Sequence, residues 1–351
     1  MARRMAELGL ALQGGGSHGA FTWGVLDRLL DEVESGALRI SGISGASAGA
    51  INGALYAAGL AQGGPKAARA KLRAFWEGVS RRGAAAGNAL FGFADPGLFG
   101  FDIDWSPGAI LLEAAGLVVS PYTNPFYYDY LAPLIGELFG APERAALNAP
   151  EAPRVFVSTT NVRTGELTIF SQPNVTVDAL RASACLPTEF KAVKVGGEFY
   201  WDGGYIANPA LDPLLGVADD LLLVLVNAFL YPNPPPTTAR QILDRLNQVT
   251  FNASLLLEVN AIEAVNAVLR AHGAPPEGQY RPIRFHKIQN ERFAETLGFV
   301  SKSSTSWALI GTLFEKGREA AGAWVGAHLG QVGRESSFDP KAELTHRVVK
   351  G

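Results

Sequence analysis

The sequence contains one tight turn that restricts the chain to a small group of folds. Residues 45–49 read Gly-Ala-Ser-Ala-Gly, after an apolar stretch and before a run of small residues over positions 50–58. This order predicts a strand, a sharp turn and a helix, with Ser47 at the turn. Such a turn crowds any side chain near the serine, which explains Gly45 and Gly49. The pattern therefore predicts an α/β fold that presents Ser47 as a nucleophile at a helix N-terminus, where negative charge is stabilised.

A second, glycine-rich turn lies upstream. Residues 8–13 form an apolar run typical of a buried strand, and residues 21–33 have the three- and four-residue spacing of a helix. The turn after the strand begins with Gly14, Gly15, Gly16 and Ser17. Consecutive glycines let the backbone approach a ligand closely and point its amides at an anion. These four residues are candidate members of an oxyanion hole, the set of donors that stabilises the charged oxygen in acyl transfer.

Residues 14–19 also match Gly-x-Gly-x-x-Gly, the pattern of dinucleotide-binding turns. A dinucleotide site predicts an acidic residue at the end of the second strand, where it binds a ribose hydroxyl. The second strand instead ends Ile-Ser-Gly at residues 43–45 and runs directly into the serine turn. We therefore expect no nucleotide cofactor, and no other cofactor is indicated.

A third turn contains a carboxylate. Residues 199–205 read Phe-Tyr-Trp-Asp-Gly-Gly-Tyr, so that Asp202 leaves an apolar strand into Gly203 and Gly204. An Asp-Gly pair often forms an ordinary Asx turn, and alone this would be the simpler interpretation. In combination with the other two turns, a rigidly held and accessible carboxylate favours a catalytic role.

These three turns, in this order, resemble the three signatures of the patatin-like phospholipases. Residues 181–187, Arg-Ala-Ser-Ala-Cys-Leu-Pro, also resemble the small-residue helix before the family's aspartate, and the motifs span roughly residues 8–215. The resemblance implies a three-layer α/β/α sandwich with a mainly parallel central sheet. It also implies a Ser47–Asp202 dyad that hydrolyses acyl esters of lipids through an acyl-enzyme. One position departs from the family: His18 stands where Arg or Lys is usual, so a permanent cation there is in question.

Residue chemistry and chain order, apart from the family resemblance, also indicate which residue activates Ser47. A serine hydroxyl needs a base, and histidine is the most frequent one. On chain order the best-placed late histidine is His286, which lies in a strand-like run among charged neighbours. Asp202 is the favoured alternative. A carboxyl with a reference pKa near 4 is a weak base, but burial would raise that pKa.

Two classes of function stay open on the sequence. The favoured one is a serine acyl hydrolase whose substrate is a phospholipid, a triacylglycerol, a small ester or a storage polyester. The alternative is a non-enzymatic protein that binds phosphate through the same glycine turns.

The composition of the chain limits the kinds of partner that we expect for it. The net charge of −3 predicts no general attraction to nucleic acid. The single cysteine, Cys185, excludes an internal disulfide and offers no metal cluster, so we expect no metal site. No run is apolar and long enough for a signal peptide or a membrane span. We therefore expect a cytoplasmic protein with, at most, transient contact with a membrane surface; the sequence leaves the oligomeric state open.

We divide the chain into a catalytic core over residues 8–230 and a mostly helical C-terminal extension over residues 231–351, packed on the core. Helical spacing over residues 242–269 and 307–329 supports that extension. Residues 83–108 are apolar but interrupted by glycine and proline. They are expected to form either a loop folded on the core or a lid over the site.

Overall fold

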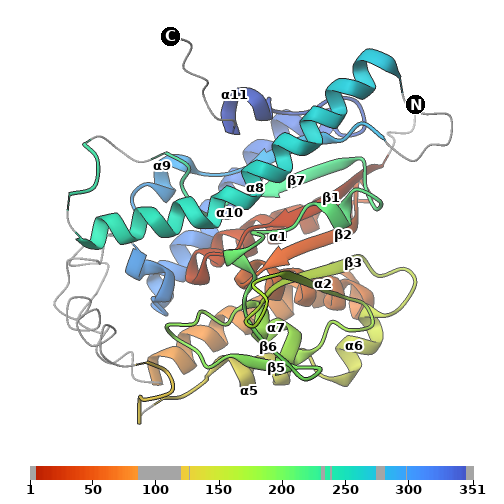
Figure 1. Ribbon diagram of the computed structural model, residues 1–351. Coiled ribbons are helices and arrows are strands. Elements are labelled where there is room, and N and C mark those ends of the chain that lie inside the picture. The colour runs from red at the N-terminus through yellow and green to blue at the C-terminus, as the bar shows by residue number, and fades with distance from the viewer. Residues whose placement is uncertain are drawn as a thin grey trace.

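The computed structural model describes residues 5–85, 120–125, 127–230, 234–237, 239–273, 281–297 and 299–344. One mixed sheet forms the centre of this part of the chain, with helices on both of its faces (Figure 1). The predicted α/β/α sandwich is therefore confirmed. Apart from their first three positions, residues 83–108 lie outside the described part, so the lid stays a prediction.

The sheet has eight strands in the described residues. From one hydrogen-bonded neighbour to the next, the strands are β5 (Val193–Val195), β6 (Glu198–Asp202), β3 (Arg154–Asn161), β2 (Leu38–Ala46), β1 (Ala6–Leu12), β7 (Asp220–Val224) and β8 (Arg284–Ile288). Strands β2 and β6 both pair with one edge of β3, and β4 (Leu167–Ser171) pairs with its other edge. The pairs from β3 to β8 along this order are parallel. The pairs that involve β4, β5 and β6 are antiparallel. The parallel strands therefore all end at one edge, where α/β proteins bind their ligands.

Successive side chains of a strand point to opposite faces of the sheet, and a hydrophobic core lies on each face. Leu8, Leu10 and Leu12 of β1 belong to the larger core, whereas Ala11 belongs to the smaller one. The larger core is covered by α1 (Gly19–Glu34), α2 (Ala48–Ala85), α5 (Leu131–Leu138) and α10 (Trp307–His328). The smaller core lies under α8 (Ala239–His272) and α11 (Pro340–Leu344). Both faces of the sheet are thus buried, as expected for parallel strands.

The remaining α-helices in the described residues are short. They are α6 (Ala141–Leu147), α7 (Val177–Ser183) and α9 (Glu291–Ala294). The long α2 is two helices joined at a kink, because Gly63 and Gly64 have non-helical backbone angles. Pro65 then begins the second half, where its fixed φ and missing N–H suit a first helical turn.

The segment after residue 231 contributes more than helices. Its strand β8 pairs in parallel with β7, so the central sheet continues beyond the predicted catalytic core. The predicted helices over residues 242–269 and 307–329 are present as α8 and α10. Among the described helices, none is both apolar and long enough to pass through a bilayer.

Candidate active site

Ser47 occupies the predicted turn between β2, which ends at Ala46, and α2, which begins at Ala48. Its φ of 53° makes it the only residue other than glycine with a positive φ among those described. A side chain in this region of backbone space is strained, and such strain concentrates at functional sites. The free amides of the first turn of α2 lie beside it, with the positive end of the helix dipole.

The two glycines of this turn leave no room for a side chain. A Cβ on Gly45 would lie 2.6 Å from the backbone nitrogen of Ala50, and one on Gly49 would lie 2.2 Å from the carbonyl oxygen of Leu12. Backbone atoms cannot move aside as a flexible side chain can. Close contact between the turn, the helix and β1 is thus the reason for Gly-x-Ser-x-Gly here.

The glycine turn after β1 lies directly against Ser47. A Cβ on Gly14 would lie 2.8 Å from the Cβ of Ser47. The amide of Gly14 donates to Oδ1 of Asn208 at 2.7 Å, so this amide already has an acceptor. No hydrogen bond from the amides of Gly15, Gly16 or Ser17 to an acceptor is found in the described part of the chain. Those three amides are therefore the available donors of this turn.

Buried amide side chains hold the glycine turn in place. The carbonyl oxygen of Gly14 accepts a hydrogen bond from Nδ2 of Asn227 at 2.9 Å. Oε1 of Gln13 accepts from the amides of Val226 and Asn227, while its Nε2 donates to Asn252. The sequence patterns did not predict this role for Gln13, Asn208, Asn227 or Asn252. Gln13 and Asn227 follow apolar strands, which is a weak local signal, and Asn208 and Asn252 have none.

Asp202 reaches Ser47 through the pairing of β3. Strand β2 pairs with β3 up to Ala46, opposite Ser158, and β6 pairs with β3 up to Asp202, opposite Thr159. Strand β4 pairs with both of these parts of β3 and therefore occupies its other edge. Strands β2 and β6 thus lie end to end along one edge of β3. Ser47 and Asp202 are brought together where the two strands meet.

The Asp202 side chain is completely buried, with 0% of its surface exposed. Its Oδ1 accepts a hydrogen bond from the amide of Gly204 at 2.7 Å, whereas Oδ2 has no partner in the described part of the chain. Burial raises the pKa of this carboxyl to about 7, although the Gly204 amide and the nearby Ser47 hydroxyl lower it. The Ser47 hydroxyl is close enough to lower this pKa, but it forms no hydrogen bond to Oδ2. Catalytic hydrogen bonds are often loose in a free enzyme.

The glycines after Asp202 close its turn against neighbouring elements. A Cβ on Gly203 would lie 2.0 Å from the carbonyl oxygen of Ser158, and one on Gly204 would lie 2.5 Å from the ring of Phe251. The helix α8, which carries Phe251, therefore packs closely against the turn that follows the carboxylate.

Ser183, at the end of α7, connects the serine turn to β3. The amide of Ser47 donates to Oγ of Ser183 at 2.9 Å, and that hydroxyl donates to the carbonyl oxygen of Ser158 at 2.7 Å. The predicted small-residue helix thus supports the strained backbone of Ser47 directly. Its neighbour Cys185 is buried, and its carbonyl oxygen accepts the amide proton of Asp202.

The histidines that we considered have other partners. His18 is buried, and burial together with the charge of Lys302 lowers its pKa to about 3, so that it is neutral near pH 7. Its Nε2 lies 2.6 Å from Oγ of Ser301. His286 lies in β8, three strands from β2, and its Nε2 is 3.0 Å from Oδ1 of Asp220. Three strand spacings correspond to about 14 Å, which places His286 out of reach of Ser47.

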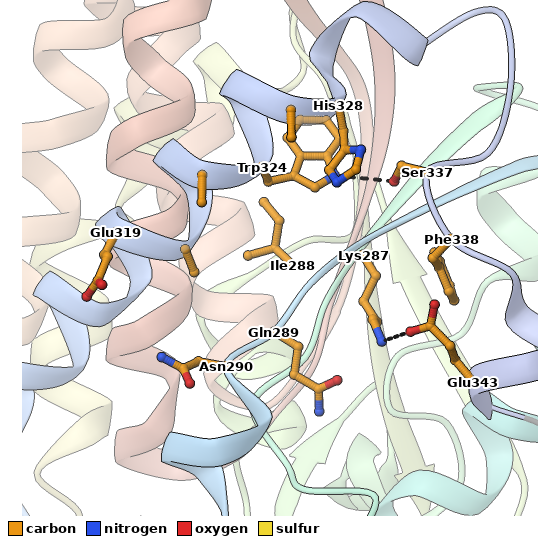
Figure 2. A pocket seen from close by; sticks show the side chains of 13 residues that line it. Lys287, Ile288, Gln289, Asn290, Glu319, Trp324, His328, Ser337, Phe338 and Glu343 are labelled. Atoms are coloured by element: carbon orange, nitrogen blue, oxygen red, sulfur yellow. Dashed lines mark hydrogen bonds and ion pairs between the residues drawn. The ribbon is translucent and has the colours of Figure 1, made fainter.

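A hollow of about 520 Å³ lies beside the edge strand β8, between α10 and α11 (Figure 2). Among its polar side chains, Lys287 forms an ion pair with Glu343, and Nδ1 of His328 contacts Gln331. Nothing in it resembles a nucleophile with its base. No group of histidine, cysteine, aspartate or glutamate suited to a metal ion is present in the described residues.

The sequence matches the family described as patatin-like phospholipase over residues 10–215, which is more than half of the chain. The chain therefore belongs to this family, and at the family level it is a lipid acyl hydrolase. Among solved structures it is similar to VipD from Legionella pneumophila, with 14% identity and a TM-score of 0.41; the match covers 92% of this chain and 67% of VipD. No curated protein matches the sequence.

Proposed function

We propose that this protein cleaves carboxylic esters of lipids by means of a Ser47–Asp202 dyad. The observation that carries the proposal is the meeting of β2 and β6 along one edge of β3, which brings the strained serine next to the buried aspartate. A carboxyl with a pKa of about 7 is half ionised near neutral pH, which suits a general base. Membership of a phospholipase family supports a lipid ester as the substrate.

The reaction follows from the positions of these groups. Asp202 accepts the proton of the Ser47 hydroxyl while the oxygen attacks the ester carbonyl. The resulting oxyanion is stabilised by the amides of Gly15, Gly16 and Ser17. Gly14 does not donate in this scheme, because its amide is bound to Asn208. The protonated Asp202 then releases its proton to the leaving alcohol, and water repeats the sequence on the acyl-enzyme.

The neutral His18 has a supporting part in this scheme. It joins the glycine turn to Ser301 and carries no charge near pH 7. The oxyanion is therefore stabilised by backbone amides, without a cation at position 18.

The proposal is tested with Ser47→Ala and Asp202→Asn, measured beside the wild type on a short-chain nitrophenyl ester and on phosphatidylcholine. Each variant is expected to lose at least about a thousandfold in kcat/KM, since the loss of a nucleophile or base removes most catalysis. A fluorophosphonate probe should label the wild type at Ser47 and leave Ser47→Ala unlabelled.

Exchange of a serine far from the site provides the control. Ser35 is exposed at the end of α1, so Ser35→Ala is expected to retain full activity and labelling. Full activity of either dyad variant would refute the mechanism. Labelling together with hydrolysis of the nitrophenyl ester, but of no lipid ester, would retain the dyad and reject the lipid substrate.

A further inference from the structure

One face of α8 is apolar and open to solvent. This helix runs across the front of the molecule in Figure 1, where no other described element covers its outer side. Six large apolar side chains on this face are between 43% and 69% exposed: Ile242, Leu246, Val249, Leu257, Val265 and Val268. The exposed alanines Ala253, Ala261 and Ala264 lie between them. We refer to the exposed residues from Leu246 to Val268 as the outer stripe.

The outer stripe lacks the charges that a solvent-facing helix normally carries. The structure describes every residue from Leu246 to Val268. None of the exposed side chains in this range is charged. The opposite side of the helix is already occupied, because Phe251, Leu255 and Val259 are buried in the molecule. A helix that is apolar on both sides is typical of one packed on both sides. The outer stripe therefore indicates a contact that the described part of one copy leaves unfilled.

The order of side chains along the outer stripe is symmetric. Leu257 is the most exposed of them and stands at the centre. Alanine lies four residues away on each side, valine eight residues away on each side, and leucine or valine eleven residues away. These pairs are Ala253 with Ala261, Val249 with Val265, and Leu246 with Val268. The exception is the exposed Thr250, whose counterpart seven residues beyond Leu257 is Ala264. Apart from this pair, the stripe reads nearly the same in both chain directions.

We propose that the outer stripe binds the outer stripe of a second copy of this chain, with the two α8 helices antiparallel. A two-fold axis requires a surface that is complementary to itself, so residue i contacts residue j and j contacts i. An axis through Leu257 meets this requirement, since it places leucine against leucine and alanine against alanine. It also places Leu246 of each copy opposite Val268 of the other.

The charges of α8 favour a protein partner over a lipid surface. Helices that lie on membranes carry Lys and Arg on the flanks of their apolar face. The sequence from Leu246 to Val268 has no Lys or Arg and contains Glu258 and Glu263. Its length of about 33 Å matches a helix-to-helix contact of several turns. The small alanines on each side of Leu257 let two helix backbones approach closely.

The first test is the oligomeric state of the full chain by sedimentation velocity. The wild type is expected to be a dimer at about 50 µM, in the range of weak to moderate protein affinities. Leu257→Lys places two like charges on the axis, and it should raise the dimer dissociation constant at least about tenfold. Leu167→Lys is the matched control, because Leu167 is also an exposed leucine, 37% exposed, but belongs to β4 and not to α8. It should remain dimeric.

Cysteine cross-linking tests the direction and the register. Leu257→Cys should form a disulfide-linked dimer under mild oxidation. Neither Leu246→Cys nor Val268→Cys should link to itself, but a mixture of the two should form the cross-linked pair. Cys185 does not compete, because it is buried and burial raises the pKa of its thiol to about 12.

Several results would overturn the proposal. One is a wild type that stays monomeric up to about 100 µM, a range in which even weak interfaces associate. Another is a Leu257→Lys protein that dimerises like the wild type while its circular dichroism is unchanged. Self-linking of Leu246→Cys would indicate a parallel pair. Monomeric protein whose sedimentation with phosphatidylcholine vesicles is lost in Leu257→Lys would assign the stripe to a lipid surface.

Discussion

The Asp202 carboxyl leads to a direct prediction about the pH dependence of hydrolysis. Burial raises its pKa to about 7, so a growing fraction is protonated as the pH falls below that value. Only the ionised form can accept the Ser47 proton. We therefore expect kcat/KM to fall about tenfold for each pH unit below 7 and to level off above about pH 8. The measurement is a kcat/KM profile with an ester that does not itself titrate, between about pH 5 and 9.

His18 is the control for this assignment, since its low pKa keeps it neutral over the same range. Conservative replacement of His18 by Asn should change the size of kcat/KM without moving the midpoint near pH 7. A profile that stays flat from about pH 5.5 to 8 would contradict a base with the pKa of Asp202.

The residues that we propose for the chemistry could be selected from the sequence, whereas those that hold them in position could not. Ser47, Asp202 and their glycines lie in short local patterns whose turn geometry depends on a few neighbouring residues. Asn208 acts on Gly14 across 194 positions of the chain, and Ser183 acts on Ser47 across 136. A single sequence carries no signal for such a contact, because any buried asparagine or serine would look the same.

The junction of β2 and α2 leads to a prediction about helix propensity. Gly49 lies in the first turn of α2, where alanine would normally stabilise a helix. A Cβ there would lie 2.2 Å from the carbonyl oxygen of Leu12, so the helix must move away from β1. Gly49→Ala is therefore expected to destabilise the protein by about 1–3 kcal/mol, as over-packing does. Thermal and urea unfolding measure the change.

Gly136 is the matched control, because it is an exposed glycine of α5 and a Cβ added there would have no atom within 4 Å. Gly136→Ala should stabilise the protein by about 0.5–1 kcal/mol, through helix propensity alone. Equal stabilisation by both substitutions would mean that α2 does not pack closely against β1.

Secondary structure could be predicted wherever the pattern was strong and local. The apolar runs and the helical spacing predicted β1, α1, α8 and α10. The antiparallel hairpin of β5 and β6 was harder to predict from the sequence, because β5 has only three residues. Yet this hairpin brings Asp202 to the site, because β6 runs antiparallel to β3 and ends beside Ser47.

The order of strands lies beyond what the sequence alone indicates. The family resemblance implied a mainly parallel sheet, and the five strands from β3 to β8 confirm it. That β8 joins β7 across about 60 residues of chain could not be predicted, because parallel partners are chosen by tertiary packing. The division of the chain at residue 230 stays a prediction.

The final prediction concerns the attachment of β8 and the following segments to the rest of the sheet. Asp220, the first residue of β7, accepts hydrogen bonds from both Nε and Nη2 of Arg284, from Nε2 of His286 and from the amide of Gly333. Burial acts against its ionisation, but the bonds from His286, Arg284 and Gly333 outweigh burial and hold the pKa of the carboxyl at about 2. One carboxylate therefore joins three segments of the chain.

A carboxyl with a lowered pKa stabilises the folded state wherever it is ionised in both states. Ionised Asp220 thus contributes about 2 kcal/mol above pH 4, and this contribution disappears as the pH falls toward 2. Asp220→Asn also leaves Arg284 without its buried partner. We expect it to lower the free energy of unfolding by about 2–4 kcal/mol at pH 7 and by much less at pH 2.5.

Urea unfolding at both pH values measures this effect, and Asp219→Asn is the control. Asp219 precedes Asp220, its side chain is 37% exposed, and its ion pair with Arg281 spans 3.7 Å. A loss below about 1 kcal/mol is expected for such a surface pair. If Asp220→Asn and Asp219→Asn lowered the free energy of unfolding equally at pH 7, Asp220 would not be the group that stabilises the attachment of β8 to β7. If Asp220→Asn lost as much at pH 2.5 as at pH 7, its effect would not depend on the charge of the carboxylate.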